Sequence, residues 1–355
     1  MLDKRDYVLV RIRRDDTEAE GIGYAYAGTS GGSLVRNAVN ELLAPILVGT
    51  DGNDIVGAWD RMYQESLLVG RRGGVLRAIS AVDIALWDLA AKRAGLPLAV
   101  LLGGGLRPVD AYASGGYYQS EAGAWTSAVR DEIEANIARG FRDHKIKVGG
   151  LSVAEDASRV AAAVETMQGE GRLAIDANNA YRTVDEALVA LRAFERAAGD
   201  RGLWWFEEPL SPDDIPGHAR LRERAQTPIA TGEIAATRWE FRDLIERGGA
   251  DVLQPDAGVL GGITEYMRVT STAATFGLPV APHWHANLHA HLAAASVNCL
   301  TVEHFMLEKD IYNFEALVLP HSRISATGGL LTLRDAPGIG IELDEEAIRR
   351  FAMLE

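Results

Sequence analysis

Hydrophobic and polar positions follow one pattern in the first hundred residues and another in the rest of the chain. The first hundred residues combine the spacing of β-strands with that of amphipathic helices. Two segments of β-strand character, 7–13 and 21–28, are separated by a polar turn at 15–18. Three segments with the periodicity of amphipathic helices follow, at 34–47, 53–67 and 75–95. The third ends on Gly95, a residue that commonly terminates helices. This part of the chain therefore predicts a small α+β domain.

From about residue 110, short apolar runs alternate with amphipathic helical segments such as 183–198 and 263–277. Eight runs have strand character: 110–118, 143–149, 172–178, 203–209, 228–233, 251–257, 278–283 and 300–305. Alternating strands and helices favour a parallel sheet, and eight such strands close a (β/α)₈ barrel. The sequence therefore predicts an α/β protein of the TIM-barrel type.

These patterns divide the chain into three segments. We predict an N-terminal α+β capping domain at 1–108, the (β/α)₈ barrel at 109–322 and a C-terminal segment at 323–355. Two short strands in the last segment, 330–333 and 338–344, are expected to return to the capping domain.

The amino-acid composition excludes some kinds of partner and site for this protein. The 355 residues include 50 acidic and 36 basic side chains, which gives a formal net charge of −14. This charge disfavours nucleic acids and anionic membranes as partners, and a small anionic substrate would need a local cation. The single cysteine, Cys299, excludes intramolecular disulfides and Cys-rich metal sites. With neither a signal-peptide pattern nor an apolar run of about 18 residues, we expect a cytoplasmic protein.

Charged and ionisable side chains recur where the predicted strands end. The active sites of (β/α)₈ barrels lie at the carboxyl ends of the strands. Any one such residue is weak evidence for a site, but an ordered set at seven successive strand ends is not required by packing. The polar strand-end residues are Lys145, Lys147, Asp176, Asn178, Glu207, Glu208, Glu233, Asp256, His283 and Glu303.

Three carboxylates on adjacent predicted strands indicate a metal site. Asp176, Glu207 and Glu233 would repel one another unless a cation lay between them. All-oxygen ligands favour Mg²⁺, with Mn²⁺ as a possible substitute. The competing interpretation is that each acid is a solvated loop residue or a helix N-cap.

Two groups suited to proton transfer are predicted on nearly opposite sides of the barrel. Lys145 and Lys147 project from the same side of one strand, where like charges lower the pKa of a lysine and make it available as a base. His283 lies one strand away from Asp256, whose carboxylate would fix the tautomer of the imidazole. The alternatives are salt-bridging lysines and a core histidine. Glu303, if protonated, could donate a hydrogen bond to a substrate carboxylate.

These residues, in this order, resemble the enolase superfamily and, within it, the mandelate racemase subgroup. The segments that carry the resemblance are SAVDIALWDLAAKRAGLPLAVLLGG, KIKVGG, IDANNAY, WFEEPL, ATGE, QPDAGVLGGITE, APH and PGIGIELDEEAI. They span nearly the whole chain. The resemblance implies a modified, enolase-like barrel under an α+β cap, and a homo-oligomer of two to eight subunits.

The resemblance also implies roles for the strand-end residues. Asp176, Glu207 and Glu233 would bind Mg²⁺, while Lys147 and His283 would act as the two acid/base groups around a metal-stabilised enediolate. Asp256 would orient His283, Lys145 would contact the substrate carboxylate and tune Lys147, and Glu303 would stabilise the intermediate. Asn178 matches a family position near the metal, and Glu208 is expected outside the ligand set.

One feature departs from the family pattern. Family members usually begin with a further strand and a mobile loop before the strand that segment 7–13 matches. The sequence predicts either a late gene start or an abbreviated cap, which would affect substrate selection. The other cap loop contains Arg71 and Arg72, which could recognise a polar or anionic distal group of the substrate, although arginines in such loops are often merely solvated.

The favoured reaction is dehydration of an acid sugar, a small carboxylate substrate. Polar and aromatic candidates for the pocket suit a hydroxylated ligand: Tyr117, Tyr118, Gln119, Trp284 and His285. The first alternative is a racemase or epimerase of a 2-hydroxy acid, in which the two bases exchange roles. The second is a non-catalytic barrel that binds a metal and a carboxylate.

Overall fold

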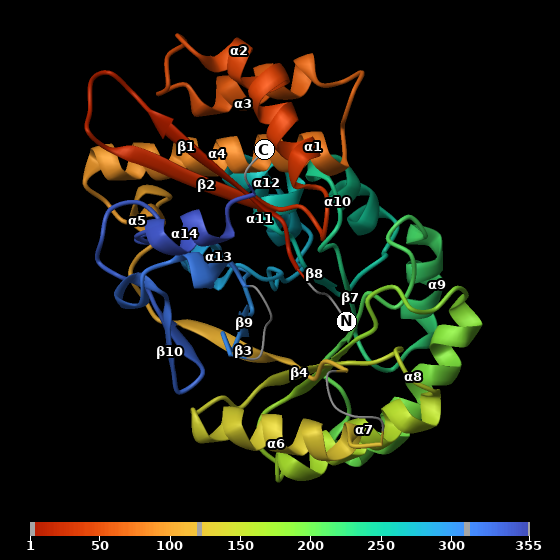
Figure 1. Ribbon diagram of the computed structural model, residues 1–355. Coiled ribbons are helices and arrows are strands. Elements are labelled where there is room, and N and C mark those ends of the chain that lie inside the picture. The colour runs from red at the N-terminus through yellow and green to blue at the C-terminus, as the bar shows by residue number, and fades with distance from the viewer. Residues whose placement is uncertain (1–3, 119–122, 309–312, 354–355) are drawn as a thin grey trace.

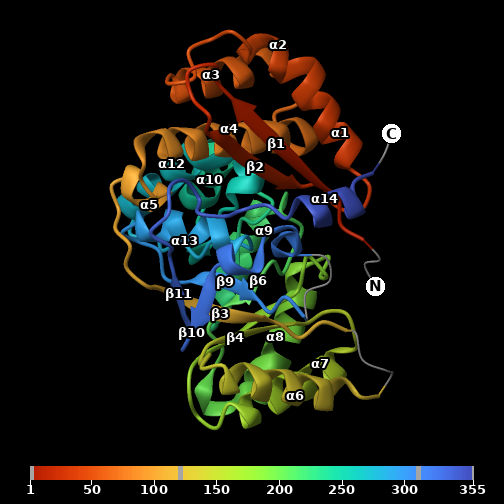
Figure 2. The same ribbon diagram turned by 60° about the vertical axis from the view of Figure 1, so that its left-hand side comes forward.

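The chain folds into a capping domain that sits on one end of a barrel. The computed structural model describes residues 4–118, 123–308 and 313–353. In Figures 1 and 2 the capping elements lie above the barrel, and the long helix α4 (Gly73–Ala94) runs between the two parts. The (β/α)₈ barrel with an N-terminal α+β cap is therefore the fold of this protein.

The capping domain has the predicted order of a hairpin followed by helices. Strands β1 and β2 pair in antiparallel register from Tyr7 opposite Tyr26 to Arg13 opposite Glu20. Helix α4 ends at Gly95, whose φ of 67° is the left-handed conformation that glycine adopts at little cost. The elements are β1 (Tyr7–Arg13), β2 (Glu20–Tyr26), α1 (Gly32–Asn37), the π-helical η1 (Ala38–Leu43), α2 (Ala44–Leu47), α3 (Ile55–Glu65), α4 and α5 (Leu98–Leu101).

The barrel is closed by parallel pairing in chain order. Strands β3 to β8 pair consecutively, and β9 pairs with β3. The elements are β3 (Val109–Gly115), α6 (Trp125–Ala138), β4 (His144–Lys147), α7 (Val153–Thr166), β5 (Leu173–Asp176), α8 (Val184–Ala198), η2 (Gly199–Arg201), β6 (Phe206–Glu207), α9 (Ile215–Arg224), β7 (Ile229–Thr231), α10 (Thr237–Glu246), β8 (Val252–Leu253), α11 (Ala257–Leu260), α12 (Gly262–Thr275), α13 (Ala286–Ala294) and β9 (Val302–Phe305).

The seventh predicted strand is reduced to a single bridging residue. Val280 bridges Leu253 on one side and Cys299 on the other. Pro279 and Pro282 flank this position and have no N–H to donate, so the hydrogen-bonded ladder cannot extend in either direction. The barrel still closes here, because the main-chain N–H of Ala281 donates to the Leu253 carbonyl of β8 and that of Val280 donates to the Asn298 carbonyl in the segment before β9.

Strand alternation places apolar side chains beneath the polar strand ends. The buried cluster that contains Ala174, Trp205 and Ala281 fills the barrel interior. Each of these residues lies two positions before Asp176, Glu207 or His283, so it projects from the same side of its strand. An apolar floor therefore supports the polar groups above it and excludes water from below.

The C-terminal segment contradicts part of the sequence prediction. Leu330 and Leu331 pair with Asp110 and Val109 of β3, so the predicted strand at 330–333 extends the barrel sheet rather than returning to the cap. The tail reaches the cap only from Gly338 onward, and residues 338–344 form isolated bridges instead of a strand. The elements are η3 (Phe314–Leu317), η4 (Pro320–Ser322), β10 (Ser325–Thr327), β11 (Leu330–Thr332) and α14 (Glu345–Phe351).

The described helices give no candidate for a membrane span. In the ranges that the structure covers, none has both the length and the apolar composition that crossing a bilayer requires.

Candidate active site

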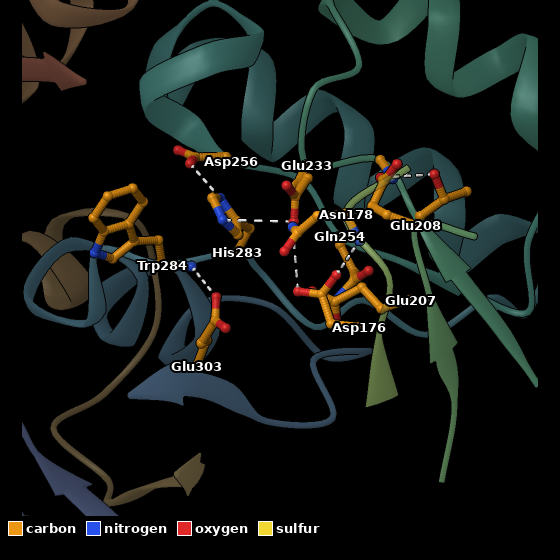
Figure 3. Close-up of polar contacts among 12 residues, drawn as sticks. Asp176, Asn178, Glu207, Glu208, Glu233, Gln254, Asp256, His283, Trp284 and Glu303 are labelled. Atoms are coloured by element: carbon orange, nitrogen blue, oxygen red, sulfur yellow. Dashed lines mark hydrogen bonds and ion pairs between the residues drawn. The ribbon is translucent and has the colours of Figure 1, made fainter. Parts of the chain in front are cut away.

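Three carboxylates meet at the carboxyl ends of the barrel strands. Asp176 and Glu207 end β5 and β6, and Glu233 follows β7. Each offers an oxygen within 4.8 Å of those of the other two, and all three side chains are buried. Figure 3 shows them pointing toward one another. Burial raises the pKa of Glu207 to about 8 and that of Glu233 to about 7, which expresses the cost of crowding acids in one place.

The donor set fits a hard divalent cation. Oxygen Oε2 of Glu233 is buried and receives no hydrogen bond from the described residues, and His283 Nε2 lies 3.6 Å from it, so it is free to accept a metal ion. Carboxylate oxygens from three neighbouring strands are ligands that Mg²⁺ prefers.

Glu207 is held in place by two donors that the sequence analysis did not single out. Trp205 Nε1 and Gln254 Nε2 both donate to Glu207 Oε2, over 2.8 and 2.7 Å. Trp205 lies two residues before Glu207, and Gln254 lies two residues before Asp256. The alternation of side chains along a strand could have identified both as neighbours of the site.

The two lysines behave differently from the sequence expectation. Lys145 is almost fully buried, contacts Glu207, and has Nζ 2.6 Å from Glu303 Oε1 and 3.5 Å from Asp176 Oδ2. Lys147 Nζ lies 2.5 Å from Asp176 Oδ2. Although burial lowers the pKa of Lys147, Asp176 outweighs this and raises the pKa above its ordinary value. Among the protein's own groups, the carboxylates therefore dominate over the predicted like-charge effect of Lys145.

His283 and Asp256 form the predicted pair. The Nδ1–H of His283 donates to Asp256 Oδ2 over 2.9 Å, and Nε2 faces Glu233 Oε2 at 3.6 Å. Burial lowers the pKa of His283, but Glu233 and Asp256 outweigh it and raise that pKa to about 10. Figure 3 shows the imidazole between the two carboxylates, so its Nε2 is the atom turned toward the cluster.

His289 on α13 supports this pair. Its Nε2 accepts the main-chain N–H of Ala257 over 3.0 Å, so Nδ1 carries the proton and donates to the Trp284 carbonyl over 2.7 Å. This neutral imidazole connects the residue after Asp256 to the residue after His283. In the described structure His289 therefore holds the segments that carry Asp256 and His283 next to each other.

Replacing Asp256 by asparagine is expected to lower kcat by about 10- to 100-fold, the usual cost of removing the group that orients a functional histidine. Asparagine can still accept the Gly258 N–H that Asp256 Oδ1 receives over 2.7 Å. The local backbone should therefore persist, and a melting curve is the control for it. A kcat within about twofold of wild type would exclude Asp256 from orienting His283.

Glu303 and Trp284 are joined at the eighth strand. The main-chain N–H of Trp284 donates to Glu303 Oε2 over 2.7 Å, while Oε1 faces Lys145. Burial raises the pKa of Glu303, but Lys145 and His283 outweigh it and hold that pKa below its ordinary value. These surroundings favour the carboxylate over the protonated acid that the sequence analysis considered.

Asn178 and Glu208 take different places beside the cluster. Asn178 adopts a φ of 42°, and its main-chain N–H donates to Asp176 Oδ1 over 2.9 Å. Glu208 turns away from the cluster, as expected, and accepts from Thr231 and from the main-chain N–H of Gly232. Figure 3 shows Glu208 set apart from Asp176, Glu207 and Glu233.

The predicted pocket residues are only partly near the cluster. Tyr117 lies with its ring centroid 5.5 Å from Lys147 Nζ. The Tyr118 hydroxyl is committed elsewhere, since it donates to Asp156 over 2.9 Å and accepts from the Gly150 N–H. The His285 ring is 1% exposed and stacks on Trp284, so it packs between cap and barrel. Gln119 lies outside the described residues.

The two arginines of the cap loop separate in the structure. Arg71 is exposed on the loop before α4, where it remains a predicted contact for the distal part of a substrate. Arg72 bridges to the barrel instead, with Nη1 3.0 Å from Asp213 Oδ1 and a further contact to Glu240 of α10. Arg72 therefore links the cap loop to the barrel domain.

Comparisons with known proteins agree with this geometry. Residues 1–103 match the model of the mandelate racemase / muconate lactonizing enzyme N-terminal domain, and residues 128–347 match that of the enolase C-terminal domain-like family. Arabinonate dehydratase of Saccharolobus solfataricus is 35% identical over 338 residues, which cover 93% of this chain and 87% of that protein.

Two solved structures resemble the fold closely. A racemase from Streptomyces coelicolor A3(2) with bound magnesium has a TM-score of 0.89 and 33% identity, and the match covers 98% of this chain and 92% of that one. L-Talarate dehydratase from Polaromonas sp. JS666, complexed with Mg and L-glucarate, has a TM-score of 0.85 and 36% identity, over 97% and 91% of the two chains. This chain therefore belongs to the mandelate racemase / muconate lactonizing enzyme family of the enolase superfamily.

Proposed function

We propose that this protein is a Mg²⁺-dependent acid-sugar dehydratase, a lyase that removes the α-proton of a carboxylate substrate and then its β-hydroxyl group. The observation that carries the proposal is that two groups suited to proton transfer contact different members of one carboxylate cluster. Lys147 contacts Asp176, and His283 contacts Glu233. The relatives named as dehydratases of sugar acids support this choice of reaction.

Three carboxylates and one lysine would hold the metal ion and the substrate. Asp176, Glu207 and Glu233 would bind the ion. When bound, Mg²⁺ supplies positive charge that neutralises these acids and the charge that develops on the substrate carboxylate. Lys145, which already contacts acids on three strands, would contact that carboxylate as well.

Lys147 and His283 would carry the protons. Whichever of them faces the α-hydrogen removes it, according to the configuration at that carbon. The electron pair of the broken C–H bond passes into an enediolate. As the carboxylate re-forms, this pair becomes the double bond between the α- and β-carbons, and the bond from the β-carbon to its hydroxyl breaks in the same step. The hydroxyl takes its bonding pair and a proton from the opposite residue and leaves as water. The enol that remains tautomerises to a 2-keto-3-deoxy acid.

A racemase or epimerase is the second candidate. With a base on either side of the substrate, the same site could remove the α-proton from one face and return one to the other. The racemase that shares the fold favours this alternative. A non-catalytic barrel that binds a metal and a carboxylate is the third candidate.

A screen of acid sugars separates these candidates. We expect the protein, supplied with Mg²⁺ and a library of aldonic and aldaric acids, to release 2-keto-3-deoxy products, which a carbonyl reagent detects. Exchange of the α-proton for deuterium in heavy water without dehydration would assign a racemase instead. Absence of both in a folded, Mg²⁺-loaded protein would overturn the enzymatic proposal and leave the binding role. The homo-oligomeric state stays a prediction, which sedimentation of the full chain would measure.

A further inference from the structure

The carboxylate that orients His283 stands at the start of a very short helix. Helix α11 has four residues, with Asp256 as its N-cap and Gly261 as its C-cap. A single turn does not persist by itself, because nucleation costs more than so few hydrogen bonds return. The direction of the Asp256 side chain therefore depends on what holds the two ends of α11.

The far end of α11 is held by the capping domain. The main-chain N–H of Gly261 donates to Ser80 Oγ over 2.9 Å, and its carbonyl accepts from Trp59 Nε1 over 2.7 Å. Ser80 lies on α4 and Trp59 on α3, so both belong to the cap. Figure 1 shows α4 lying over α11 and α12, and Figure 2 shows α12 beneath α4 from another side.

The next turn of the barrel chain is capped from the same helix. The N-cap of α12, Gly261, has no side chain to satisfy the first N–H groups of that helix. Asp83 of α4 takes this role across the domain boundary: Oδ2 accepts the main-chain N–H of Thr264 over 2.9 Å, and Oδ1 accepts its hydroxyl over 2.6 Å. The negative charge also faces the positive end of the α12 dipole.

The local backbone is shaped for this contact. Gly262 has a φ of 92°, and a Cβ atom at this position would lie 2.3 Å from Asp83 Oδ2. Only glycine therefore permits the approach of the carboxylate. Asp83 is fully buried, and burial raises its pKa to about 7 even though the hydrogen bonds from Thr264 lower it. Those bonds thus support a carboxylate that burial alone would disfavour.

We propose that Asp83 is a positioning residue of the capping domain: by capping α12 it fixes α11, and through α11 it aligns Asp256 with His283. The contact of the cap with the barrel is then what aligns Asp256 with His283. The inference rests on the proposed role of His283 in proton transfer, and its test separates the two.

Helix α4 offers a matched control. Asp88 is also a buried carboxylate that accepts main-chain N–H groups, but from Ile22 of the cap and Ile339 of the tail, each at 2.8 Å, and it pairs in addition with Lys92, whose Nζ lies 2.7 Å from Oδ2. Asp83→Asn and Asp88→Asn each place an amide NH₂ where an acceptor oxygen stood, so each loses one acceptor in a buried position. Only the first change disturbs the segment that leads back to Asp256.

The first measurement is amide hydrogen exchange of the full chain, which does not depend on activity. Asp83→Asn is expected to speed exchange at Gly261 and Thr264 by about 10-fold or more, while Asp88→Asn does so at Ile22 and Ile339. Unchanged exchange at Gly261 in Asp83→Asn would show that Asp83 does not hold α11, and would overturn the proposal.

The second measurement is α-proton exchange in heavy water, with Mg²⁺ and acid sugars of either configuration at the α-carbon. Asp83→Asn is expected to slow exchange on the His283 side by about 10- to 100-fold and to leave the Lys147 side within about twofold. Asp88→Asn should leave the ratio of the two sides unchanged. A parallel loss on both sides in Asp83→Asn would also overturn the proposal.

If Asp83→Asn does not fold, Ser80→Ala provides the milder version, because it removes one acceptor of the Gly261 N–H and leaves the other, the Ala257 carbonyl. Ser80→Ala is expected to lower the ratio of exchange on the His283 side to exchange on the Lys147 side, by a smaller factor than Asp83→Asn. An unchanged ratio would count against the proposal. Failure of the proposed function itself looks different, since wild type would then show no exchange on either side.

Discussion

Replacing Lys147 by alanine is expected to lower kcat for dehydration by about 10²- to 10⁴-fold, the usual contribution of a positioned base or acid. The Lys147 side chain is 12% exposed, whereas Lys145 is 1% exposed and occupied by acids from three strands, so Lys147 is the lysine open to a substrate. In heavy water, α-proton exchange should disappear from the substrate whose hydrogen faces Lys147 and persist from the one that faces His283.

Metal affinity is the control for this variant. Lys147 Nζ lies 2.5 Å from Asp176 Oδ2, so its ammonium competes with a cation for that carboxylate. Titration calorimetry of Lys147→Ala with Mg²⁺ should therefore show an affinity equal to or higher than that of wild type. Turnover within tenfold of wild type at saturating Mg²⁺ would remove Lys147 from the proposed chemistry.

Removal of the metal is expected to abolish turnover. Dialysis against a chelator should reduce activity to the detection limit, a loss of about 10³-fold or more, because charge on the developing intermediate is then no longer neutralised. Addition of Mg²⁺ should restore it, and Mn²⁺ should restore it in part. Full activity of the chelated protein would contradict the proposed cofactor.

Two adjacent glutamates give the matched test of the ligand set. Glu207→Gln should weaken Mg²⁺ binding by about 100-fold or more, measured by titration of the metal alone, because a charged ligand is lost. Glu208→Gln should leave the metal affinity within a few-fold and lower the melting temperature instead. Its carboxylate accepts from Thr231, Gly232 and Asn179, and an amide cannot accept at both ends. Equal loss of affinity in both variants would contradict this division.

The local pattern of the sequence determined the elements and most of the candidate site. Apolar periodicity reflects which side of a helix or strand is buried, so 7–13, 75–95 and the barrel strands could be predicted without coordinates. Parallel strands of a barrel end at one face, so Asp176, Glu207 and Glu233 were expected together. Gln254 and Trp205 were predictable in the same way, from their spacing of two residues to a site residue, although they were not identified.

Which partner each charged group takes depends on the tertiary structure. Lys145 was expected to tune Lys147, and its charge does oppose the raised pKa of Lys147, but the closed barrel also surrounds Lys145 with Glu207, Glu303 and Asp176, and no pattern along one strand encodes that enclosure. Likewise the strand at 330–333 was assigned to the cap, since its composition fits any sheet edge. Its pairing with Val109 and Asp110 depends on how the barrel between residues 110 and 330 folds and brings the two segments together.

The contact between Asp83 and Thr264 shows this limit most clearly. The two residues are 181 positions apart, and each by itself looks like an ordinary member of its helix. Hydrophobic periodicity shows which side of a helix is buried. It does not show which surface that side packs against, because the hydrophobic effect is non-directional. Local sequence pattern was therefore enough to predict the fold, the carboxylate cluster and the pairing of His283 with Asp256. The docking of cap on barrel decided how that pair is held, because hydrogen bonds between domains require both surfaces to be formed first.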